Sequence, residues 1–408
     1  MTLIECFDRS VIENILGCLH LRPQKLIFLG DEQQMRQAAE RYRAFLSSRG
    51  MDTKIQLRHV HMDKMDNIVA ALNDIVQHEK KCVIDVTGGD ERVLMAVGAV
   101  LSRLDSQQRQ AVSVQQFDPQ TGFAQDCDND GKVIEGHPTK LTVKELVSLH
   151  GGIIHPSSEQ PSHDHTPRDL ETLWELACTE PKVWNRRIAI LSEFESRADS
   201  RTQVFLPLNY IQHSIKQFDE KYPILLELLQ KFQRRGIIHG LLIRTNSVSY
   251  TYADELRRCC TLKAGNILEI KTLLEARSLE ENGTPYFDDC QMSVQIDWDG
   301  IVHPSVSRIP ETRNEIDLIL TRGLTPLFIS CKNGDIGEDE LYKLNTVASR
   351  FGGPLARKML IATHLDRKNP FSDRAFIQRA RDMGIYLVTD AAELSKSEWK
   401  QIFISAME

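Results

Sequence analysis

Short apolar runs alternate with amphipathic stretches of helical periodicity through residues 1–120, and this pattern limits the possible folds more than any other feature of the chain. Runs of this length and composition are typical of strands, and the stretches between them are long enough for helices. Strands that alternate with helices favour a parallel, doubly wound sheet of Rossmann-like type. The expected strands are 2–7, 25–29, 54–61, 82–86 and 111–117, and the expected helices are 10–19, 32–48, 66–78 and 90–104.

The chain is 408 residues long, which predicts two or three domains at roughly 100–200 residues per domain. Residues 1–150 are the expected Rossmann-like domain, and 151–168, which are rich in Gly, Pro, Ser and His, are the expected linker. Residues 169–258 are mostly helical in pattern, and 259–408 return to α/β character.

The middle segment has the outline of a winged helix. An amphipathic helix at 222–235 is followed by two β-like runs that flank a turn, and its basic residues Lys231, Arg234 and Arg235 could contact phosphate. The alternative is a helical spacer with a solvated basic end.

Composition excludes several classes of protein. Apolar residues make up 41% and charged residues 26% of the chain, as in ordinary globular proteins. No apolar run approaches the length of a transmembrane helix, and the nine cysteines contain no CxxC pair. We therefore expect a cytoplasmic protein with no membrane partner and no disulfide framework. The formal net charge of −7 argues against a protein that coats nucleic acid through a global positive field.

Two adjacent apolar runs near the C-terminus carry polar residues at alternating positions. Glu315 and Asp317 share one face of the first run, and Ser330 and Lys332 share one face of the second. With 321–326 as a hairpin loop, Asp317 lies opposite Ser330 and Glu315 opposite Lys332, with side chains about 5 Å apart. Polar groups from both strands are thus expected on one face of an apolar hairpin.

A carboxylate beside a lysine on rigid strands suits phosphodiester hydrolysis. The carboxylate can hold Mg²⁺ or Mn²⁺, which polarises a phosphoryl oxygen and lowers the pKa of bound water. The lysine can orient that water and offset the charge that develops on phosphorus. The alternative is an ordinary surface ion pair of Asp317 and Lys332, worth less than about 1 kcal/mol.

Glu269 is the candidate third member of this site. It has a competing explanation, because Asn266 followed three residues later by Glu269 is a variant capping box. In that case the Glu269 carboxylate would only satisfy an N-terminal amide of its own helix.

Three loops follow expected strands of the N-terminal domain and should open on one edge of the sheet. Glycines at this edge let backbone amides approach a ligand. There is no GxGxxG fingerprint and no P-loop lysine, and acidic residues after the glycines would repel a phosphate, so contacts to ribose or base edges fit better. The alternative is a tight turn with Asp90 as N-cap. The candidate ligand-binding residues are Asp8, Arg9, Ser10, Gly30, Asp31, Thr87, Gly88, Gly89 and Asp90.

Several ordered motifs resemble a known family. The first three are similar to the core of a PD-(D/E)xK restriction-endonuclease-like nuclease, and the others resemble CRISPR ancillary nucleases, in which such a domain is fused to an N-terminal CARF domain that senses cyclic oligoadenylate. The motifs are Gly265–Glu269, Asn314–Asp317, Ile329–Lys332, Tyr342–Leu344, Phe351–Gly353 and, further upstream, Leu141–Leu146 with Gly151–Gly152.

The resemblance implies a metal-dependent nuclease of type III CRISPR antiviral defence, activated allosterically by cyclic tetra-adenylate or hexa-adenylate bound at the three loops. Its substrate would be single-stranded DNA or RNA, or duplex DNA that it nicks. A two-fold symmetric ring suits a homodimer. Glu269, Asp317 and the main-chain carbonyl of Cys331 would bind Mg²⁺ or Mn²⁺, and Lys332 would orient water.

This chain departs from the family pattern at one position. The family has an acid two residues before the lysine, and this chain has Ser330. Asp317 and Glu269 with waters could still hold Mg²⁺, since this ion often takes only one or two carboxylates, and Glu315 is a possible substitute. The departure motivates a second hypothesis, a ligand-responsive nucleic-acid-binding regulator with a degenerate nuclease domain.

Overall fold

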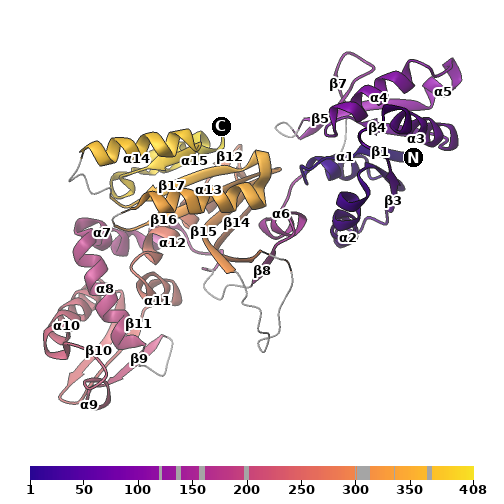
Figure 1. The fold of residues 1–408 in the computed structure, drawn as a ribbon. Coiled ribbons are helices and arrows are strands. Elements are labelled where there is room, and N and C mark those ends of the chain that lie inside the picture. Colours follow the sequence, from indigo (N-terminus) through magenta and orange to yellow (C-terminus); the bar gives the residue numbers. More distant parts are fainter. Residues whose placement is uncertain are drawn as a thin grey trace.

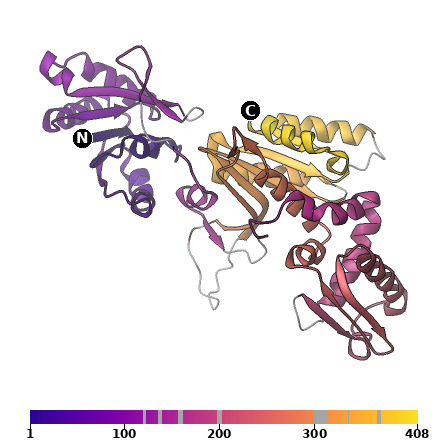
Figure 2. The same cartoon turned by 180° about the vertical axis from the view of Figure 1, so that it is seen from behind.

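The structure is a computed structural model of the chain. It describes residues 1–118, 122–134, 139–155, 161–196, 202–298, 300, 313–334, 336–364 and 370–408. The described residues form an N-terminal lobe and a C-terminal lobe on either side of helix α6, and a middle segment that lies against the C-terminal lobe, away from the N-terminal lobe (Figures 1 and 2). Within these residues, no helix has the length and apolar character needed to cross a membrane.

A seven-stranded sheet forms the centre of the N-terminal lobe, in the order β3-β2-β1-β4-β5-β6-β7. The first five strands in this order are parallel, and β6 and β7 continue the sheet antiparallel. The predicted Rossmann-like sheet is therefore confirmed, with a hairpin added at one edge. The strands are β1 (Thr2–Cys6), β2 (Lys25–Gly30), β3 (Lys54–His59), β4 (Cys82–Asp85), β5 (Val112–Asp118), β6 (Phe123–Asp126) and β7 (Lys132–Ile134).

Helices cover both faces of this sheet. Alternate residues of one strand enter separate cores, as Leu3 packs with α1 and α2 while Ile4 packs with α3 and α4. This explains why the strands read as continuous apolar runs rather than alternating ones. The helices are α1 (Glu13–Leu21), α2 (Glu32–Ser48), α3 (Met65–His78), α4 (Glu91–Leu101) and the short α5 (Ser106–Gln110).

The middle segment has winged-helix topology. Its antiparallel sheet has the order β10-β11-β9, so the strand that precedes α9 and α10 lies beside the last strand of the hairpin that follows them. The expected hairpin is present, and a third strand that the sequence did not indicate completes the sheet. The elements are α7 (Glu171–Thr179), α8 (Pro181–Glu195), β9 (Gln203–Pro207), α9 (Leu208–Ile211), α10 (Phe218–Arg234), β10 (Ile238–Arg244), β11 (Ser247–Tyr252) and α11 (Glu255–Leu262).

The C-terminal lobe is built on a six-stranded sheet in the order β18-β17-β16-β15-β14-β8. Strands β16, β17 and β18 are parallel, and the remaining pairs are antiparallel. The strands are β14 (Asp289–Asp297), β15 (Arg313–Arg322), β16 (Thr325–Lys332), β17 (Arg357–Ala362), β18 (Ile385–Val388) and β8 (Ile153–His155), with a small separate ribbon of β12 (Glu280–Glu281) and β13 (Thr284–Pro285). The helices are α12 (Asn266–Arg277), α13 (Glu338–Gly352), α14 (Pro370–Asp382) and α15 (Lys396–Met407).

One edge strand of this sheet comes from the segment expected to be a linker. Strand β8, within 151–168, pairs with the end of β14. The chain reaches this edge through Gly152, where a Cβ atom would lie 2.6 Å from the ring of Phe351 and 3.0 Å from Ile296. Only glycine fits such a close approach. Part of the expected linker is therefore an integral piece of the C-terminal lobe.

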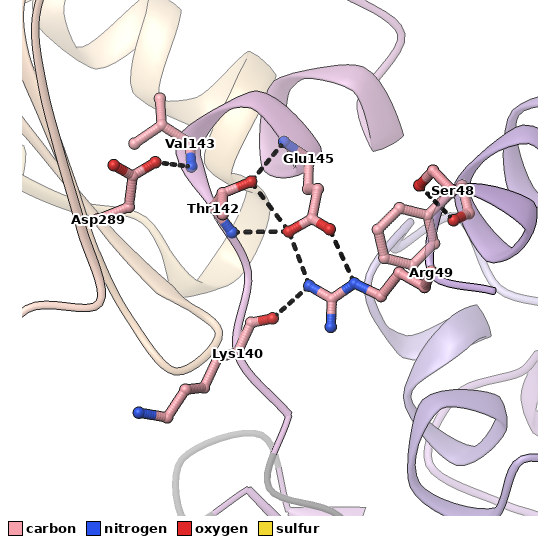
Figure 3. Close-up of polar contacts among 8 residues, drawn as sticks. Ser48, Arg49, Lys140, Thr142, Val143, Glu145 and Asp289 are labelled. Atoms are coloured by element: carbon pink, nitrogen blue, oxygen red, sulfur yellow. Dashed lines mark hydrogen bonds and ion pairs between the residues drawn. The ribbon is translucent and has the colours of Figure 1, made fainter. Parts of the chain in front are cut away.

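Helix α6 (Val143–Leu149) joins the two lobes through a chain of polar contacts (Figure 3). Arg49, at the C-terminal end of α2, donates to both carboxylate oxygens of Glu145 at 2.8 and 2.7 Å. Glu145 also accepts from the backbone N–H of Thr142 at 2.8 Å, as part of a capping box. On the other side of α6, the N–H of Val143 donates to Asp289, the first residue of β14, at 2.9 Å. The contacts therefore connect a helix of the N-terminal lobe to the C-terminal sheet.

Candidate active site and ligand-binding edge

The β15–β16 hairpin has the register that the alternation of polar and apolar residues predicts. Leu318 pairs with Ile329 and Leu320 with Leu327, so the polar positions fall on one face. The loop is shorter than expected, because pairing continues to Arg322 and Thr325 and leaves only two residues in the turn. The expected loop at 321–326 is therefore wrong in length, although the register is unchanged.

Asp317 is held by the strand opposite it. Its Oδ2 atom accepts hydrogen bonds from the hydroxyl of Ser330 at 3.2 Å and from the N–H of Cys331 at 2.6 Å. The ammonium group of Lys332 lies 3.6 Å from the same oxygen. Ser330 thus stabilises the orientation of the Asp317 carboxylate. The acid that the family pattern has at this position would instead bring a second negative charge close to Asp317.

Glu269 does not act as a helix cap. The N-cap of α12 is Gly265, and the side chain of Asn266 donates instead to the carbonyl of Cys259 at 3.0 Å. Burial and the neighbouring carboxylates of Asp317 and Glu315 raise the pKa of Glu269 to about 8. A carboxyl group with two acidic neighbours is a place where a cation relieves repulsion.

Lys332 is the positive centre of this site. Burial by itself lowers its pKa, but the carboxylates of Asp317 and Glu340 more than offset this and raise it. The ammonium lies 3.0 Å from Glu340 Oε2. Lys332 is therefore protonated at neutral pH, and it acts as a charge and a hydrogen-bond donor rather than as a base.

Glu340, in the first turn of α13, is the residue that the sequence analysis missed. It is one of three consecutive acids, Glu338, Asp339 and Glu340. In the sequence, such a run indicates only the usual favourable negative charge at a helix N-terminus. Only the packing of α13 against the sheet brings it to Lys332. Together with the hairpin it lines a cavity of about 90 Å³, whose other lining residues are Asn314, Glu315, Ile316, Asp317, Ile329, Ser330, Lys332, Lys343, Leu344 and Val347.

The donor set suits a hard divalent cation bound partly through water. No group of three or more His, Cys, Asp or Glu side chains in the described residues is arranged to enclose a metal ion. Burial and the charges of Asp317 and Glu315 raise the pKa of Glu269 despite the opposing charges of Lys263 and Lys332, so the carboxylates converge on this point. Burial raises the pKa of the Cys331 thiol well above its usual value, so this residue offers no thiolate and could contribute only its carbonyl.

The three loops at the edge of the N-terminal sheet lie together, as expected. Asp8 Oδ1 accepts from the N–H of Ser10 at 2.7 Å, and its Oδ2 accepts from the N–H of Gly89 at 3.0 Å. Gly30 approaches the first loop so closely that a Cβ atom there would lie 2.9 Å from the Cβ of Phe7. Asp8 therefore ties the first and third loops together.

The other acidic residues of these loops cap helices. Asp31 accepts from the N–H of Gln34 at 3.0 Å at the start of α2, and Asp90 accepts from the N–H of Arg92 at 3.0 Å at the start of α4. The capping role considered for Asp90 is thus confirmed. Arg9 is exposed at the same edge.

A buried carboxylate supports the glycine-containing loop from below. Asp85, the last residue of β4, accepts hydrogen bonds from the N–H of Thr87 at 2.9 Å and from its hydroxyl. The same hydroxyl accepts from the N–H of Phe117 at 2.7 Å, and Gln115 donates to Asp85 at 2.7 Å. Thr87 is therefore fixed between two strands, which sets the position of Gly88.

Comparison with known proteins supports the fold. Neither family models nor curated proteins match the chain. Protein VC1899 from Vibrio cholerae has a similar structure, with a TM-score of 0.69 and 17% identity over 100% of this chain and 97% of that chain. Can2 from Sulfobacillus thermosulfidooxidans, solved in complex with cyclic tetra-adenylate, gives a TM-score of 0.67 and 16% identity over 100% of this chain and 99% of that chain. Over its whole length, the chain therefore has the fold of these two proteins, as the resemblance to CARF-domain nucleases led us to expect.

Proposed function

We propose that the protein is a metal-dependent nuclease that is switched on by a cyclic oligoadenylate and acts in type III CRISPR defence. The observation that carries the proposal is that Asp317 and Lys332 lie 3.6 Å apart in one small cavity of the C-terminal lobe, with the Glu269 carboxyl near enough for their charges to shift its pKa. The similarity in fold to Can2, a protein solved with cyclic tetra-adenylate, supports the choice of activator.

Each residue of the site has a distinct role in this proposal. Asp317, Glu269 and the carbonyl of Cys331 would hold Mg²⁺ or Mn²⁺, which when bound polarises the phosphoryl group and lowers the pKa of water. Lys332, held in its protonated form, donates a hydrogen bond to the attacking water and offsets the negative charge that develops on phosphorus. Ser330 keeps Asp317 in place through its hydroxyl group.

The edge of the N-terminal sheet is the proposed activator site. Its three loops present the Thr87–Gly89 turn, held to the first loop by Asp8, and the exposed Arg9 to the adenylate ring. A ring with two-fold symmetry would be shared between two copies of the chain, so the active form is a homodimer.

Helix α2 is a direct route from this edge to the C-terminal lobe. It begins at the Asp31 cap and is 17 residues long, or about 26 Å at 1.5 Å per residue. Its far end carries Arg49, which holds Glu145 at the start of α6 (Figure 3). A ligand that displaces the start of α2 would thus move α6 and the sheet behind it, provided that it binds more tightly to the active arrangement.

The test is cleavage of fluorescently labelled single-stranded DNA, single-stranded RNA and supercoiled plasmid with Mn²⁺ or Mg²⁺, with and without cyclic tetra-adenylate or hexa-adenylate. We expect cleavage only with both metal and activator, and none from Asp317→Asn or Lys332→Met proteins. No cleavage of any substrate by folded wild-type protein would refute the proposal. Wild-type activity in the two variants would refute the assignment of the site.

The winged-helix topology of the middle segment favours a second candidate, a ligand-responsive nucleic-acid-binding regulator. Lys231 and Arg234 lie in the last turn of α10, but its first turn carries Asp219 and Glu220. An acidic first turn is unfavourable for a helix that enters a groove of DNA. Sequence-specific binding of duplex DNA without hydrolysis, unaffected by Lys332→Met, would favour this second function over the first.

A further inference from the structure

Helix α13 adds a charged pair to the cavity that the hairpin alone does not contain. The two carboxylate oxygens of Glu340 each hold a different lysine. Oε2 lies 3.0 Å from the ammonium of Lys332, and Oε1 accepts a hydrogen bond from the ammonium of Lys343 at 2.7 Å. One carboxylate therefore sets the positions of two positive charges relative to each other.

Glu340 holds Lys332 more directly than Asp317 does. The distance from Lys332 to Asp317 is 3.6 Å, against 3.0 Å to Glu340. Asp317 Oδ2 already accepts hydrogen bonds from Ser330 and Cys331. A lysine has four flexible side-chain bonds and needs a partner to keep its ammonium in one place. In this cavity Glu340 is that partner.

Lys343 lies at the mouth of the cavity. Its side chain is 64% exposed, and its second partner, Asp339, is 67% exposed at 3.1 Å, whereas the side chain of Glu340 is only 22% exposed. An exposed ion pair contributes little to stability, because water screens the attraction. Lys343 can therefore exchange Asp339 for a phosphate oxygen at little cost while Glu340 keeps its hold.

We infer that Lys343 is a phosphate-binding subsite at the rim of the cavity, and that Glu340 is a positioning residue that fixes both lysines. The ligand class is the phosphodiester backbone of a nucleic acid strand, with Lys343 taking a phosphate beside the one that faces Lys332. This inference rests on the proposed nuclease function. It adds two residues from α13 whose roles differ, since Lys343 acts in binding and Glu340 in the placement of Lys332.

The first experiment replaces Glu340 by Gln, which keeps the shape and removes the charge. We expect kcat to fall by about 10- to 100-fold, because a displaced catalytic group can cost that much, with KM changed less than kcat. Glu338→Gln, on the same turn but outside the cavity lining, is the matched control and should cleave like wild type. Glu340→Asp, which keeps the charge on a shorter side chain, should recover part of the loss, and equal melting temperatures would exclude a folding defect.

The second experiment measures binding rather than cleavage. A fluorescein-labelled single-stranded oligonucleotide is titrated with the activated protein in Ca²⁺, and the affinity is followed against salt concentration. Lys343→Met should bind more weakly, and its slope of log K against log salt should be smaller by about 0.7, the value for one lost contact to a single strand. Lys400→Met, an exposed lysine on α15 outside the cavity lining, should keep the wild-type slope.

The outcomes separate this inference from the proposed function. Wild-type protein that binds but never cleaves would refute the nuclease function, and the positioning role of Glu340 with it. Active wild type together with a Glu340→Gln protein of unchanged kcat would overturn the positioning role alone. An unchanged salt slope in Lys343→Met would overturn the phosphate subsite, whether or not cleavage is observed.

Discussion

At the scale of single residues, the carboxyl group of Glu269 links metal binding to pH. Burial and the carboxylates of Asp317 and Glu315 raise its pKa to about 8, so at neutral pH without metal it is largely protonated. A metal ligand must lose its proton, so the proton and the cation compete. We expect the affinity for Mn²⁺ to fall about tenfold per pH unit below about pH 8, as measured by calorimetry over about pH 6 to 9. Glu269→Gln should bind Mn²⁺ weakly with a flat pH profile, and a flat profile in wild type would contradict the assignment.

A second residue-scale prediction concerns Glu5, which lies buried beside Asp85 under helix α1. A Cβ atom on Gly17 of that helix would lie 2.7 Å from the Glu5 carboxylate. Burial, and then the charge of Asp85, raise the pKa of Glu5 well above its usual value. The folded state keeps this proton while the unfolded chain releases it, so stability falls as pH rises from the usual range of a glutamate towards the raised pKa.

Glu5→Gln removes that cost without changing the size of the side chain. We expect its melting temperature to exceed that of wild type at about pH 8 and the difference to vanish near about pH 3, where the carboxyl is protonated in both states. Glu40→Gln, on the exposed face of α2, should show neither effect. A melting temperature for Glu5→Gln below wild type at both pH values would show that the carboxyl is needed for packing.

At the scale of elements, α6 depends on its capping box because it is short. It has seven residues, with Thr142 as N-cap and Glu145 completing the box. We expect Thr142→Ala to lower the free energy of unfolding by about 1 kcal/mol, measured by urea denaturation. Ser148→Ala, an exposed change on the same helix, should have a smaller effect, and equal effects would show that the cap does not stabilise the helix.

At the scale of the whole molecule, the Arg49–Glu145 pair should transmit the activating signal. Apolar residues of α2, α6 and the C-terminal sheet belong to one continuous core, so the lobes are packed together as well as ion-paired. We expect Arg49→Ala to bind cyclic tetra-adenylate with wild-type affinity, measured by calorimetry, but to give a several-fold smaller increase in cleavage on activation. Arg43→Ala, on the same helix but paired with Glu40 instead, is the control. Full activation of Arg49→Ala would show that the signal takes another route.

The pattern of the sequence by itself determined the parts of this protein that depend on periodicity. Alternation with a period of two specifies hairpin register, because a slip of one residue would expose Ile316 and Leu318 and bury Asp317. Strand–helix alternation likewise determined the parallel N-terminal sheet. These features follow from which side chains must be buried, and the order of apolar and polar residues along the chain reveals that.

Only the tertiary structure decided which separate elements meet. Strand β8 has three residues, too few to show a pattern, and it pairs because α6 delivers it to the edge of the sheet. Arg49 and Glu145 are 96 residues apart, and nothing local distinguishes them from other charged residues. In the sequence, Glu340 is not distinguished from an ordinary acid at the start of a helix. The packing of α13 places it beside Lys332. Such contacts depend on how packed elements are placed relative to one another, which periodicity does not report. Periodicity identified the strands that carry Asp317 and Lys332. Packing of α13 brought Glu340, the carboxylate that holds Lys332.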